Sequence, residues 1–443
     1  MGTPLESSPA GGGTRGWSPR DRVHGRIRPP GSKSIAQRAI LLAVRADPAD
    51  RDLELRGLGT GRDVEACLGV ASSLGARVRR ASGGTVHLRP HKGPWPTSLE
   101  VGESATLARF TTALAALHGG GAIRVGGEGT LRRRRSPSLV ASLEEVGARL
   151  RPESPEGLWP LEITPRSGES PEKIILRDPV SSQEVSALWI AGAWMPAGMR
   201  VVVDGTIPSR SYLDLTRMVL DRFGVRVVGA DTDARIAGVP HLPPTGFSVE
   251  PDASGAAVAL AAGCLSGGRV EVEGIGPDSV QGDTAIVEHL RAFGCTAERD
   301  HGQLVAKGRP RCGAHLDLSA TPDLAPVLVA VAAGAALFAG ASSRFDGLGT
   351  LRGKESDRVA ALAEVLRAAD FDAREESDAI EVHPSASARR GRRVLDPRGD
   401  HRIAFAIALL GLLRPGIRCA RAACVEKSWP GFWGDLEALG AGS

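Results

Sequence analysis

One kind of helix ending recurs six times along the chain. In each copy an amphipathic run closes on an apolar residue, usually followed by glycine, and a strand-like segment comes next. Successive copies lie 70–77 residues apart. The six endings are Leu74-Gly75, Val146-Gly147, Phe223-Gly224, Phe293-Gly294, Ala369-Asp370 and Leu439-Gly440. So regular a spacing predicts six copies of one folding unit.

A second helix, apolar on most of its surface, precedes each of these endings and repeats in step with them. It begins at a residue that can cap a helix N-terminus. The six caps are Ser32, Ser104, Ser181, Asp252, Thr321 and Asp400. Val-rich segments such as residues 200–204 and 269–273 fill the gaps, so each unit combines strands with one buried and one half-exposed helix.

Helices that are apolar on all sides must be enclosed by other elements. Three units can do this by wrapping their strands around a bundle of such helices, so six units make two similar lobes. We therefore predict an α/β fold of two inside-out lobes, each of three repeated units. One lobe is expected over residues 33–248 and the other over 23–32 with 249–443. Residues 1–22, rich in Gly, Ser and Pro, are predicted to be a disordered tail.

Composition narrows the class of function without naming one. A formal net charge of +4 over 443 residues suits small anionic substrates. Six scattered cysteines without a C-x-x-C pair favour a reduced, cytoplasmic protein with no metal site. The apolar run at residues 324–340 is short for a membrane span and contains Pro326, so a buried helix is expected. The arginine run at residues 132–135 is more typical of a solvated face than of a nucleic-acid patch.

Cations and hydroxyl groups gather at the starts of the buried helices. Free backbone N–H groups and the helix dipole attract anions at such positions. Lys33, Ser34 and Arg38 open the first buried helix. Similar groups open the second, third and sixth, namely Thr106, Arg109, Ser181, Ser182, Gln183, His401 and Arg402. The sequence therefore predicts anion binding at several units at once.

Two carboxylates stand among these basic groups: Asp323, at the start of the fifth buried helix, and Glu355. A carboxylate at a helix start is most often a cap, so spacing alone gives neither a chemical role. Flanking cations are expected to hold Glu355 ionised unless a substrate changes its surroundings. Lysine is scarce in this arginine-rich chain, yet Lys33, Lys354 and Lys427 all lie in polar clusters, which indicates a chemical need for them.

Four motifs follow one another along the chain: Pro30-Gly31-Ser32-Lys33-Ser34 with Arg38, Ser181-Ser182-Gln183, Arg352 through Lys354-Glu355-Ser356-Asp357-Arg358, and Gly399-Asp400-His401-Arg402. Together they resemble the signatures of the 5-enolpyruvylshikimate-3-phosphate synthase family. The resemblance implies two lobes of three repeats that close over two substrates. It also implies a reaction, in which the enolpyruvyl group of phosphoenolpyruvate moves to the 5-hydroxyl of shikimate 3-phosphate and phosphate is released. This step belongs to the shikimate pathway of aromatic amino-acid biosynthesis and needs no metal or organic cofactor.

The resemblance implies a role for each matching residue. Those expected to hold shikimate 3-phosphate are Lys33, Ser34, Arg38, Ser181, Ser182, Gln183, Ser209, Tyr212, Asp323 and Lys354. Those expected around phosphoenolpyruvate are Lys33, Ala105, Arg134, Gln183, Arg358, Arg402 and Lys427. By the same resemblance Asp323 accepts the hydroxyl proton and Glu355 protonates the methylene carbon of phosphoenolpyruvate. Lys33 and Lys427 are then expected to stabilise the departing phosphate.

The second buried helix departs from the family pattern of Asn, a small residue, Gly and Thr, because this chain reads Glu103-Ser104-Ala105-Thr106. Glu103 places a negative charge beside a bound anion, which should weaken binding unless the side chain turns away or pairs with an arginine. Ala105 adds a methyl group where the backbone approaches the ligand. In the family this exchange of glycine for alanine is associated with tolerance to glyphosate, so reduced sensitivity is expected here.

Other readings of the resemblance stay open. A related class transfers the same unit to a UDP-sugar and uses a Lys-Asn pair and a loop cysteine, whereas this chain has Lys33-Ser34 and no cysteine between Cys67 and Cys264. A specialised transferase for a shikimate analogue is another alternative, because Gln37 and Thr350 also stand where the family often has Asn.

A binding paralogue of the same fold is a further alternative. Asp323, Glu355 and Lys427 argue against it, since binding alone needs no proton acceptor or donor. We expect small-molecule partners only, with no nucleic acid and no membrane, and a monomeric protein.

Overall fold

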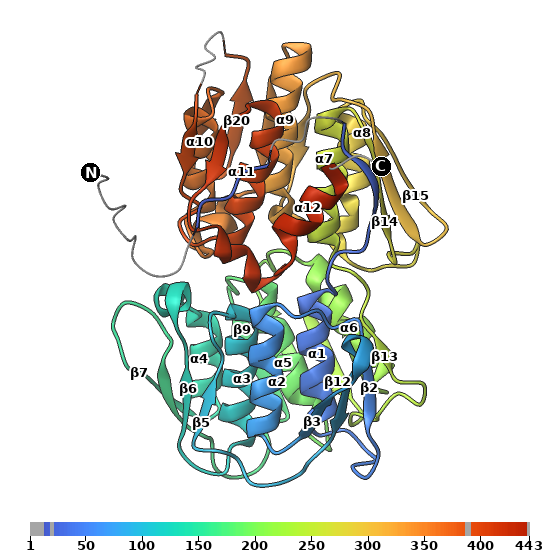
Figure 1. The fold of residues 1–443 in the computed structure, drawn as a ribbon. Coiled ribbons are helices and arrows are strands. Elements are labelled where there is room, and N and C mark those ends of the chain that lie inside the picture. The colour runs from blue at the N-terminus through green and yellow to red at the C-terminus, as the bar shows by residue number, and fades with distance from the viewer. Residues whose placement is uncertain (1–12, 18–21, 386–390, 441–443) are drawn as a thin grey trace, which may run out of the picture.

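The computed structural model describes residues 13–17, 22–385 and 391–440, which form two lobes (Figure 1). One hydrophobic core runs from Ile35 to Val249. The other contains Val23 and a long series of residues from Ala253 to Leu439. The predicted α/β fold of two lobes with buried helices is confirmed.

Among the described residues, five of the six units place a parallel strand pair beside an antiparallel hairpin. The second unit shows the pattern, in which β5 lies parallel to β6, β8 runs antiparallel to β6, and β7 forms the outer edge. The strands of the first lobe are β2 (Leu53–Arg56), β3 (Arg77–Arg80), β4 (Val86–Arg89), β5 (Ser98–Glu100), β6 (Ile123–Gly126), β7 (Arg149–Pro152), β8 (Leu161–Thr164), β9 (Lys173–Arg177), β10 (Met199–Asp204), β11 (Arg226–Ala230), β12 (Asp233–Ala237) and β13 (Phe247–Ser248). Its helices are α1 (Lys33–Val44), α2 (Arg62–Ser73), α3 (Ala105–His118), the 3-10 turn η2 (Gly129–Arg133), α4 (Pro137–Glu145), α5 (Ser182–Ala193) and α6 (Ser211–Arg222).

The second lobe repeats this order, although its last unit has a sheet of two strands in place of four. Its strands are β1 (His24–Ile27), β14 (Arg269–Glu273), β15 (Thr296–Asp300), β16 (Gln303–Lys307), β17 (His315–Asp317), β18 (Ser343–Asp346), β19 (Asp372–Glu375), β20 (Ile380–His383), β21 (Arg393–Leu395) and β22 (Ile417–Cys419). Its helices are α7 (Ala253–Ser266), η3 (Gly282–Ala285), α8 (Ile286–Ala292), η4 (Pro322–Leu324), α9 (Ala325–Ala339), η5 (Gly349–Gly353), α10 (Arg358–Ala368), α11 (His401–Leu413), η6 (Ala422–Lys427) and α12 (Phe432–Gly440).

The chain passes between the lobes twice, and the two passages lie side by side. The backbone N–H of Ser32 donates to the carbonyl of Glu250 over 2.9 Å, and that of Asp252 donates to the carbonyl of Pro30 over 2.9 Å. Gly31 is required here, because a Cβ at this position would lie 1.7 Å from the carbonyl oxygen of Gly57. As a result β1 pairs in parallel with β14 of the second lobe, and β13 pairs in parallel with β2 of the first.

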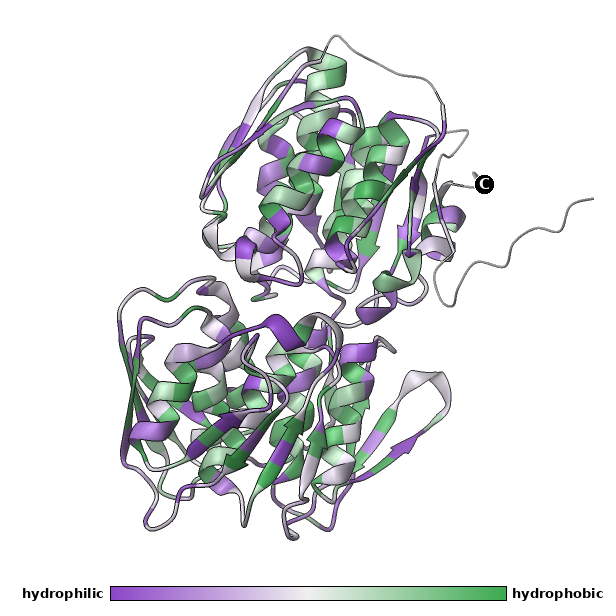
Figure 2. Cartoon of the chain, turned by 90° about the vertical axis from the view of Figure 1, so that its left-hand side faces the viewer, coloured by the Kyte–Doolittle hydropathy of each residue, from purple (hydrophilic) through white to green (hydrophobic). Residues whose placement is uncertain are grey.

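The six buried helices begin where the capping residues predict. The side chains of Ser104, Ser181, Asp252 and Asp400 accept backbone N–H groups of the first turn. Figure 2 shows green, hydrophobic helices inside each lobe. Within the described residues one segment, Pro322–Ala339, is long and apolar enough to cross a membrane, but 83% of it is buried in its lobe. This segment is the core helix that the sequence predicts.

The first five amphipathic helices also end where predicted, each at a left-handed residue, whereas α12 runs through Gly440. Gly75, Gly147, Gly224 and Gly294 all have φ between 75° and 95°. The fifth copy has Asp370 with φ of 60° instead of glycine. Aspartate tolerates this conformation better than most residues, which explains why the repeat survives the exchange.

The prediction of a disordered tail over residues 1–22 is wrong for residues 13–17. The backbone of Arg15 exchanges hydrogen bonds with Cys419, at 3.0 Å and 2.6 Å. Trp17 is 4% exposed and belongs to the core of the second lobe. The large apolar surface of one tryptophan outweighs the polar composition around it. Residues 1–12 and 18–21 lie outside the described residues.

Candidate active site

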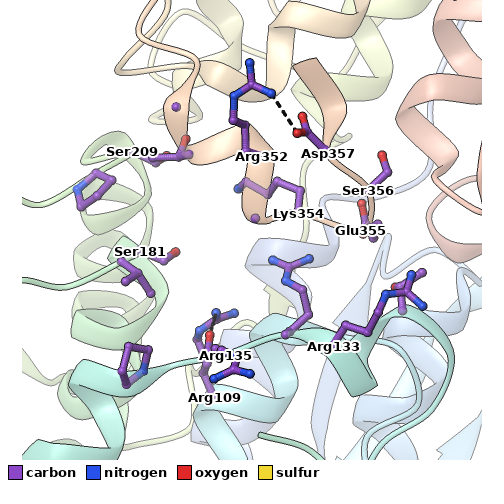
Figure 3. Close-up of a pocket in the computed structure, with 18 of the residues that line it drawn as sticks. Arg109, Arg133, Arg135, Ser181, Ser209, Arg352, Lys354, Glu355, Ser356 and Asp357 are labelled. Atoms are coloured by element: carbon purple, nitrogen blue, oxygen red, sulfur yellow. Dashed lines mark hydrogen bonds and ion pairs between the residues drawn. The ribbon is translucent and has the colours of Figure 1, made fainter. Parts of the chain in front are cut away.

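A cavity of about 850 Å³ opens between the two lobes. Figure 3 shows Arg133 and Arg135 of the first lobe on one side and Arg352 and Lys354 of the second lobe on the other. A narrower cavity of about 60 Å³ adjoins it, and both are lined by Arg134, Lys354 and Glu355. The starts of the buried helices surround this narrow cavity, as their anion-binding character predicts.

Two equivalent turns bring cations to the cleft from opposite lobes. The sequence Gly-Thr-Leu-Arg occurs both in η2 and in η5, which occupy the same place in the second and fifth units. In both turns the leucine, Leu131 or Leu351, is fully buried and its carbonyl accepts the N–H three residues later. Those N–H groups belong to Arg134 and Lys354. The remaining arginines of the run, at residues 132, 133 and 135, are exposed, as predicted for a solvated face.

The structure gathers the predicted site residues at these cavities. Twelve of them line the narrow cavity: Lys33, Ser34, Ala105, Arg134, Gln183, Tyr212, Asp323, Lys354, Glu355, Arg358, Arg402 and Lys427. Ser181 and Ser209 line the wider one, and Ser209 has a strained φ of 53°. Arg38 and Ser182 line neither cavity.

Arg38 lies beneath the cavity floor. Its guanidinium donates to the carbonyl of Ser34 at 2.8 Å, to Thr216 Oγ1 at 2.7 Å and to Ser186 Oγ at 3.3 Å. All three partners are neutral, and burial lowers the pKa of Arg38 to about 9, with Tyr212 opposing the shift. Arg38 therefore supports the main chain of Ser34 from below. The buried hydroxyl of Ser182 has no hydrogen-bond partner among the described residues.

Arg358, in the first turn of α10, is the centre of a buried ion-pair cluster. Its guanidinium lies 2.9 Å from Asp323 Oδ1 and 2.7 Å from Asp400 Oδ2, and it also contacts Glu355. Burial alone lowers its pKa, but the three carboxylates outweigh burial and raise it above the usual range. Asp400, which the sequence identifies only as a helix cap, thus orients a cation of the site.

Asp323 is surrounded by positive charge. Arg402 lies 3.4 Å and Lys354 3.8 Å from its carboxylate, in addition to Arg358. Burial raises the pKa of Asp323, but these cations and a hydrogen bond from Tyr212 hold it well below its usual range. Asp323 is therefore a carboxylate in this state of the site.

Glu355 is held in the same way. Lys427 Nζ lies 2.8 Å from its Oε1, and His401 Nδ1 lies 3.8 Å from the same oxygen. Burial raises the pKa of Glu355, yet Lys427 and Arg358 lower it far below the usual range. The expectation that flanking cations keep Glu355 ionised is confirmed.

The remaining lysines are held differently. Lys33 Nζ lies 2.7 Å from Asp63 Oδ2, a partner that sequence reasoning missed because Asp63 stands at the start of a separate amphipathic helix. The side chain of Lys354 is partly buried, and this burial lowers its pKa to about 8 although Asp323 raises it. A further contact that was missed joins Arg109 to Gln183 Oε1 at 2.9 Å and so fixes the amide of Gln183.

Glu355, Asp400 and His401 bring possible ligand atoms within 4.8 Å of one another, as a metal site would. The cations Arg358 and Lys427 already contact the two carboxylates, and burial lowers the pKa of His401 well below its usual value. The carboxylates are thus directed at protein cations, which is a poor arrangement for a metal ion.

Positive charge is in excess at the site. The residues that line the narrow cavity include six lysines and arginines against three carboxylates, Asp63, Asp323 and Glu355. Such an excess in a buried place favours small, highly charged anions.

Comparison with solved structures places the fold among enolpyruvyl transferases. EPSP synthase from Acinetobacter baumannii is similar with a TM-score of 0.76 and 23% identity, over 96% of this chain and 97% of that one. The enolpyruvyl transferase NikO from Streptomyces tendae has a TM-score of 0.71 and 15% identity, over 97% of this chain and 98% of that one.

The sequence defines the family. The protein-family model for EPSP synthase (3-phosphoshikimate 1-carboxyvinyltransferase) matches residues 17–436. The 3-phosphoshikimate 1-carboxyvinyltransferase of Methanopyrus kandleri is 36% identical over 94% of this chain and 96% of its own length, and that of Thiobacillus denitrificans is 33% identical over the same shares. The chain belongs to the EPSP synthase family.

Proposed function

We propose that the chain catalyses transfer of the enolpyruvyl group of phosphoenolpyruvate to the 5-hydroxyl of shikimate 3-phosphate, with release of phosphate. This is the activity for which its family is named, and it is a step of the shikimate pathway. The observation that carries the proposal is the buried excess of cations around two carboxylates, Asp323 and Glu355, where the lobes meet. We also expect the protein to be cytoplasmic and monomeric.

The acceptor is assigned to the side of the cleft formed by α5, α6 and η5. Ser181 and Ser209 line the wider cavity and offer hydroxyl groups for its phosphate, and Lys354 lines both cavities. Tyr212 lines the narrow cavity, and Ser182, next to Ser181, is assigned to the same phosphate from the family resemblance alone. Ser34 and Gln183 complete this side, with Arg38 adding charge from beneath Ser34.

Phosphoenolpyruvate is assigned to the side formed by Arg134, Arg358, Arg402 and Lys427, with Lys33 between the two substrates. Arginine side chains bind carboxylate and phosphate groups through two parallel hydrogen bonds. Without these cations the repulsion between two multiply charged anions would keep the reacting atoms apart.

Proton transfer follows from what substrate binding does to the ion pairs. When a substrate anion pairs with Arg358 and Lys427, these cations stabilise the carboxylates of Asp323 and Glu355 less. The pKa values of Asp323 and Glu355 therefore rise. Glu355 can then carry a proton to the methylene carbon, while Asp323 accepts the proton of the 5-hydroxyl. The resulting tetrahedral intermediate carries a methyl group, and it loses a proton from that methyl group together with phosphate from the neighbouring carbon, which restores the carbon–carbon double bond. Lys33 and Lys427 stabilise the departing phosphate.

Reduced sensitivity to glyphosate is a further part of the proposal. Ala105 is the first residue of α3 and its side chain lines the narrow cavity beside Thr106. Its methyl group takes space that a glycine leaves open to a ligand longer than phosphoenolpyruvate.

One assay tests the activity. Phosphate release from phosphoenolpyruvate is followed with shikimate 3-phosphate, unphosphorylated shikimate or UDP-N-acetylglucosamine as acceptor. The proposal expects release with shikimate 3-phosphate alone. Preference for either of the other acceptors would assign the chain to a specialised transferase, and turnover with none would favour a binding protein.

A further inference from the structure

Glu103, which the sequence predicts to weaken anion binding unless it turns away or pairs with an arginine, faces a lysine of the active site instead. The backbone carbonyl of Glu103 accepts a hydrogen bond from Lys427 Nζ at 3.1 Å. Its side-chain Oε2 lies 4.0 Å from the same nitrogen, and the side chain is 36% exposed. Lys427 ends η6 in the second lobe, whereas Glu103 precedes the cap of α3 in the first, so this contact joins the lobes.

The neighbouring turn leaves a place for this carboxylate. Gly129 opens η2 with φ of 54°, and a Cβ there would lie 1.6 Å from Glu103 Oε1. A side chain at position 129 would therefore displace the Glu103 carboxylate. The absence of one lets that carboxylate sit against the turn that also carries Arg134.

The ammonium group of Lys427 therefore lies near two carboxylates. Glu355 Oε1 lies 2.8 Å from Lys427 Nζ, and Glu103 Oε2 lies 4.0 Å from the same nitrogen. Lys427 lines the narrow cavity and Glu103 does not, so Glu103 acts on a substrate only through Lys427.

We propose that the backbone carbonyl of Glu103 holds Lys427 at the phosphoenolpyruvate site, while the side-chain carboxylate of Glu103 competes with phosphoenolpyruvate for the charge of Lys427. The inference rests on the proposed function. The phosphate of phosphoenolpyruvate then pairs with the ammonium group of Lys427, whose charge Glu103 already partly neutralises. Glu103 therefore weakens phosphoenolpyruvate binding selectively, while the acceptor, which lies on the opposite side of the cleft, is unaffected.

The charge of Glu103 depends on its surroundings. Burial raises its pKa, Lys427 lowers it, and the nearby carboxylates Glu355, Glu128 and Asp63 raise it. The net shift is upward. Because a raised pKa means that the carboxylate gains its proton at a higher pH, its competition with the substrate is present at neutral and alkaline pH and fades as the pH falls.

The test is the Glu103→Gln variant, with KM for each substrate and kcat measured from about pH 5.5 to about pH 8. At about pH 8 the KM for phosphoenolpyruvate should fall about three- to fivefold, the upper part of the range for a partly exposed ion pair. The KM for shikimate 3-phosphate and kcat should stay within about twofold. The ratio of the phosphoenolpyruvate KM of the unaltered enzyme to that of Glu103→Gln should approach one toward pH 5.5. The ionisation of phosphoenolpyruvate affects both KM values equally and cancels in this ratio.

A matched control lies one residue before Lys427. Glu426 pairs with Arg62 of the first lobe at 2.5 Å, so Glu426→Gln also removes an ion pair between η6 and the first lobe but leaves Lys427 untouched. This control should not lower the KM for phosphoenolpyruvate. Glu103→Asp, which keeps the charge, should stay close to the unaltered enzyme. If Glu103→Gln does not fold, Glu103→Asn, which removes the same charge, is used in place of that variant.

An unchanged or higher KM for phosphoenolpyruvate in Glu103→Gln would overturn the inference. So would an equal change in Glu426→Gln, which would indicate general loosening of the lobes, or an equal change in both substrates. These outcomes all require an active unaltered enzyme. Failure of the proposed function would instead appear as no turnover by the unaltered enzyme.

Discussion

The hydroxyl group of Tyr212 donates a hydrogen bond of 2.9 Å to the carboxylate of Asp323. Tyr212 is the only tyrosine in the chain and lies on α6 of the first lobe, whereas Asp323 lies in η4 of the second. Burial and the negative charge of Asp323 raise the pKa of Tyr212 well above its usual value. The phenol therefore keeps its proton and joins the two lobes through the residue assigned as the base.

Tyr212→Phe tests the importance of this bond. A hydrogen bond to a charged group contributes about 1.5–3 kcal/mol, so kcat/KM for shikimate 3-phosphate should fall at least about tenfold. The same change should raise the pKa of Asp323, because the phenol stabilises the carboxylate, and should move the acid limb of the pH profile upward. Steady-state kinetics over a pH series measures both effects. Kinetics indistinguishable from the unaltered enzyme would show that the bond between lobes has no part in the reaction.

The lowered pKa of Lys354 predicts an upper pH limit for binding of the acceptor. Its pKa of about 8, lowered by burial, means that the ammonium is present below pH 8 and is lost as the pH rises through that value. kcat/KM for shikimate 3-phosphate, which reports the free enzyme, should therefore decline above about pH 8.

Lys354→Arg keeps the charge at all accessible pH values, so it should move this alkaline decline to higher pH. Lys173→Arg is a suitable control because Lys173 is exposed on β9 and lines neither cavity. An alkaline limb at the same pH in Lys354→Arg would mean that another group causes it.

Ala105 predicts the response to glyphosate. Removing its methyl group should lower the inhibition constant for glyphosate by about tenfold relative to the KM for phosphoenolpyruvate, since a steric clash of this size costs about 1–3 kcal/mol. Inhibition of the unaltered enzyme and of Ala105→Gly is compared at matched phosphoenolpyruvate concentration. Thermal unfolding of both proteins controls for the cost of glycine in a helix. Strong inhibition of the unaltered enzyme would contradict the steric explanation.

Local patterns in the sequence predicted the architecture well. The caps from Ser32 to Asp400 and the endings from Gly75 to Gly294 depend on a few neighbouring residues, so both are visible in sequence. The equivalence of Arg134 and Lys354 could have been found in the same way, by aligning the Gly-Thr-Leu-Arg turns of the second and fifth units. This pattern identifies two site cations without reference to any family.

Contacts between distant residues could not be predicted from spacing. The pair of Lys33 with Asp63 and the contact of Glu103 with Lys427 join segments that only the folded chain brings together. Arg38 was correctly placed on the first buried helix, but its position beneath Ser34 depends on Thr216 and Ser186 from other helices. Trp17 was missed because the tail was judged by its composition, whereas one buried aromatic side chain decides where such a segment lies.

The most direct measurement of the central claim is the isotope content of the product made in D₂O. If Glu355 protonates the methylene carbon and phosphate then leaves, incubation with phosphoenolpyruvate and shikimate 3-phosphate should yield the enolpyruvyl product with deuterium in its vinyl group. Mass spectrometry and proton NMR detect it, and Glu355→Gln should reduce both product and label by at least about a hundredfold. No enolpyruvyl product, or a product formed without deuterium, would contradict the proposed addition and elimination between the lobes.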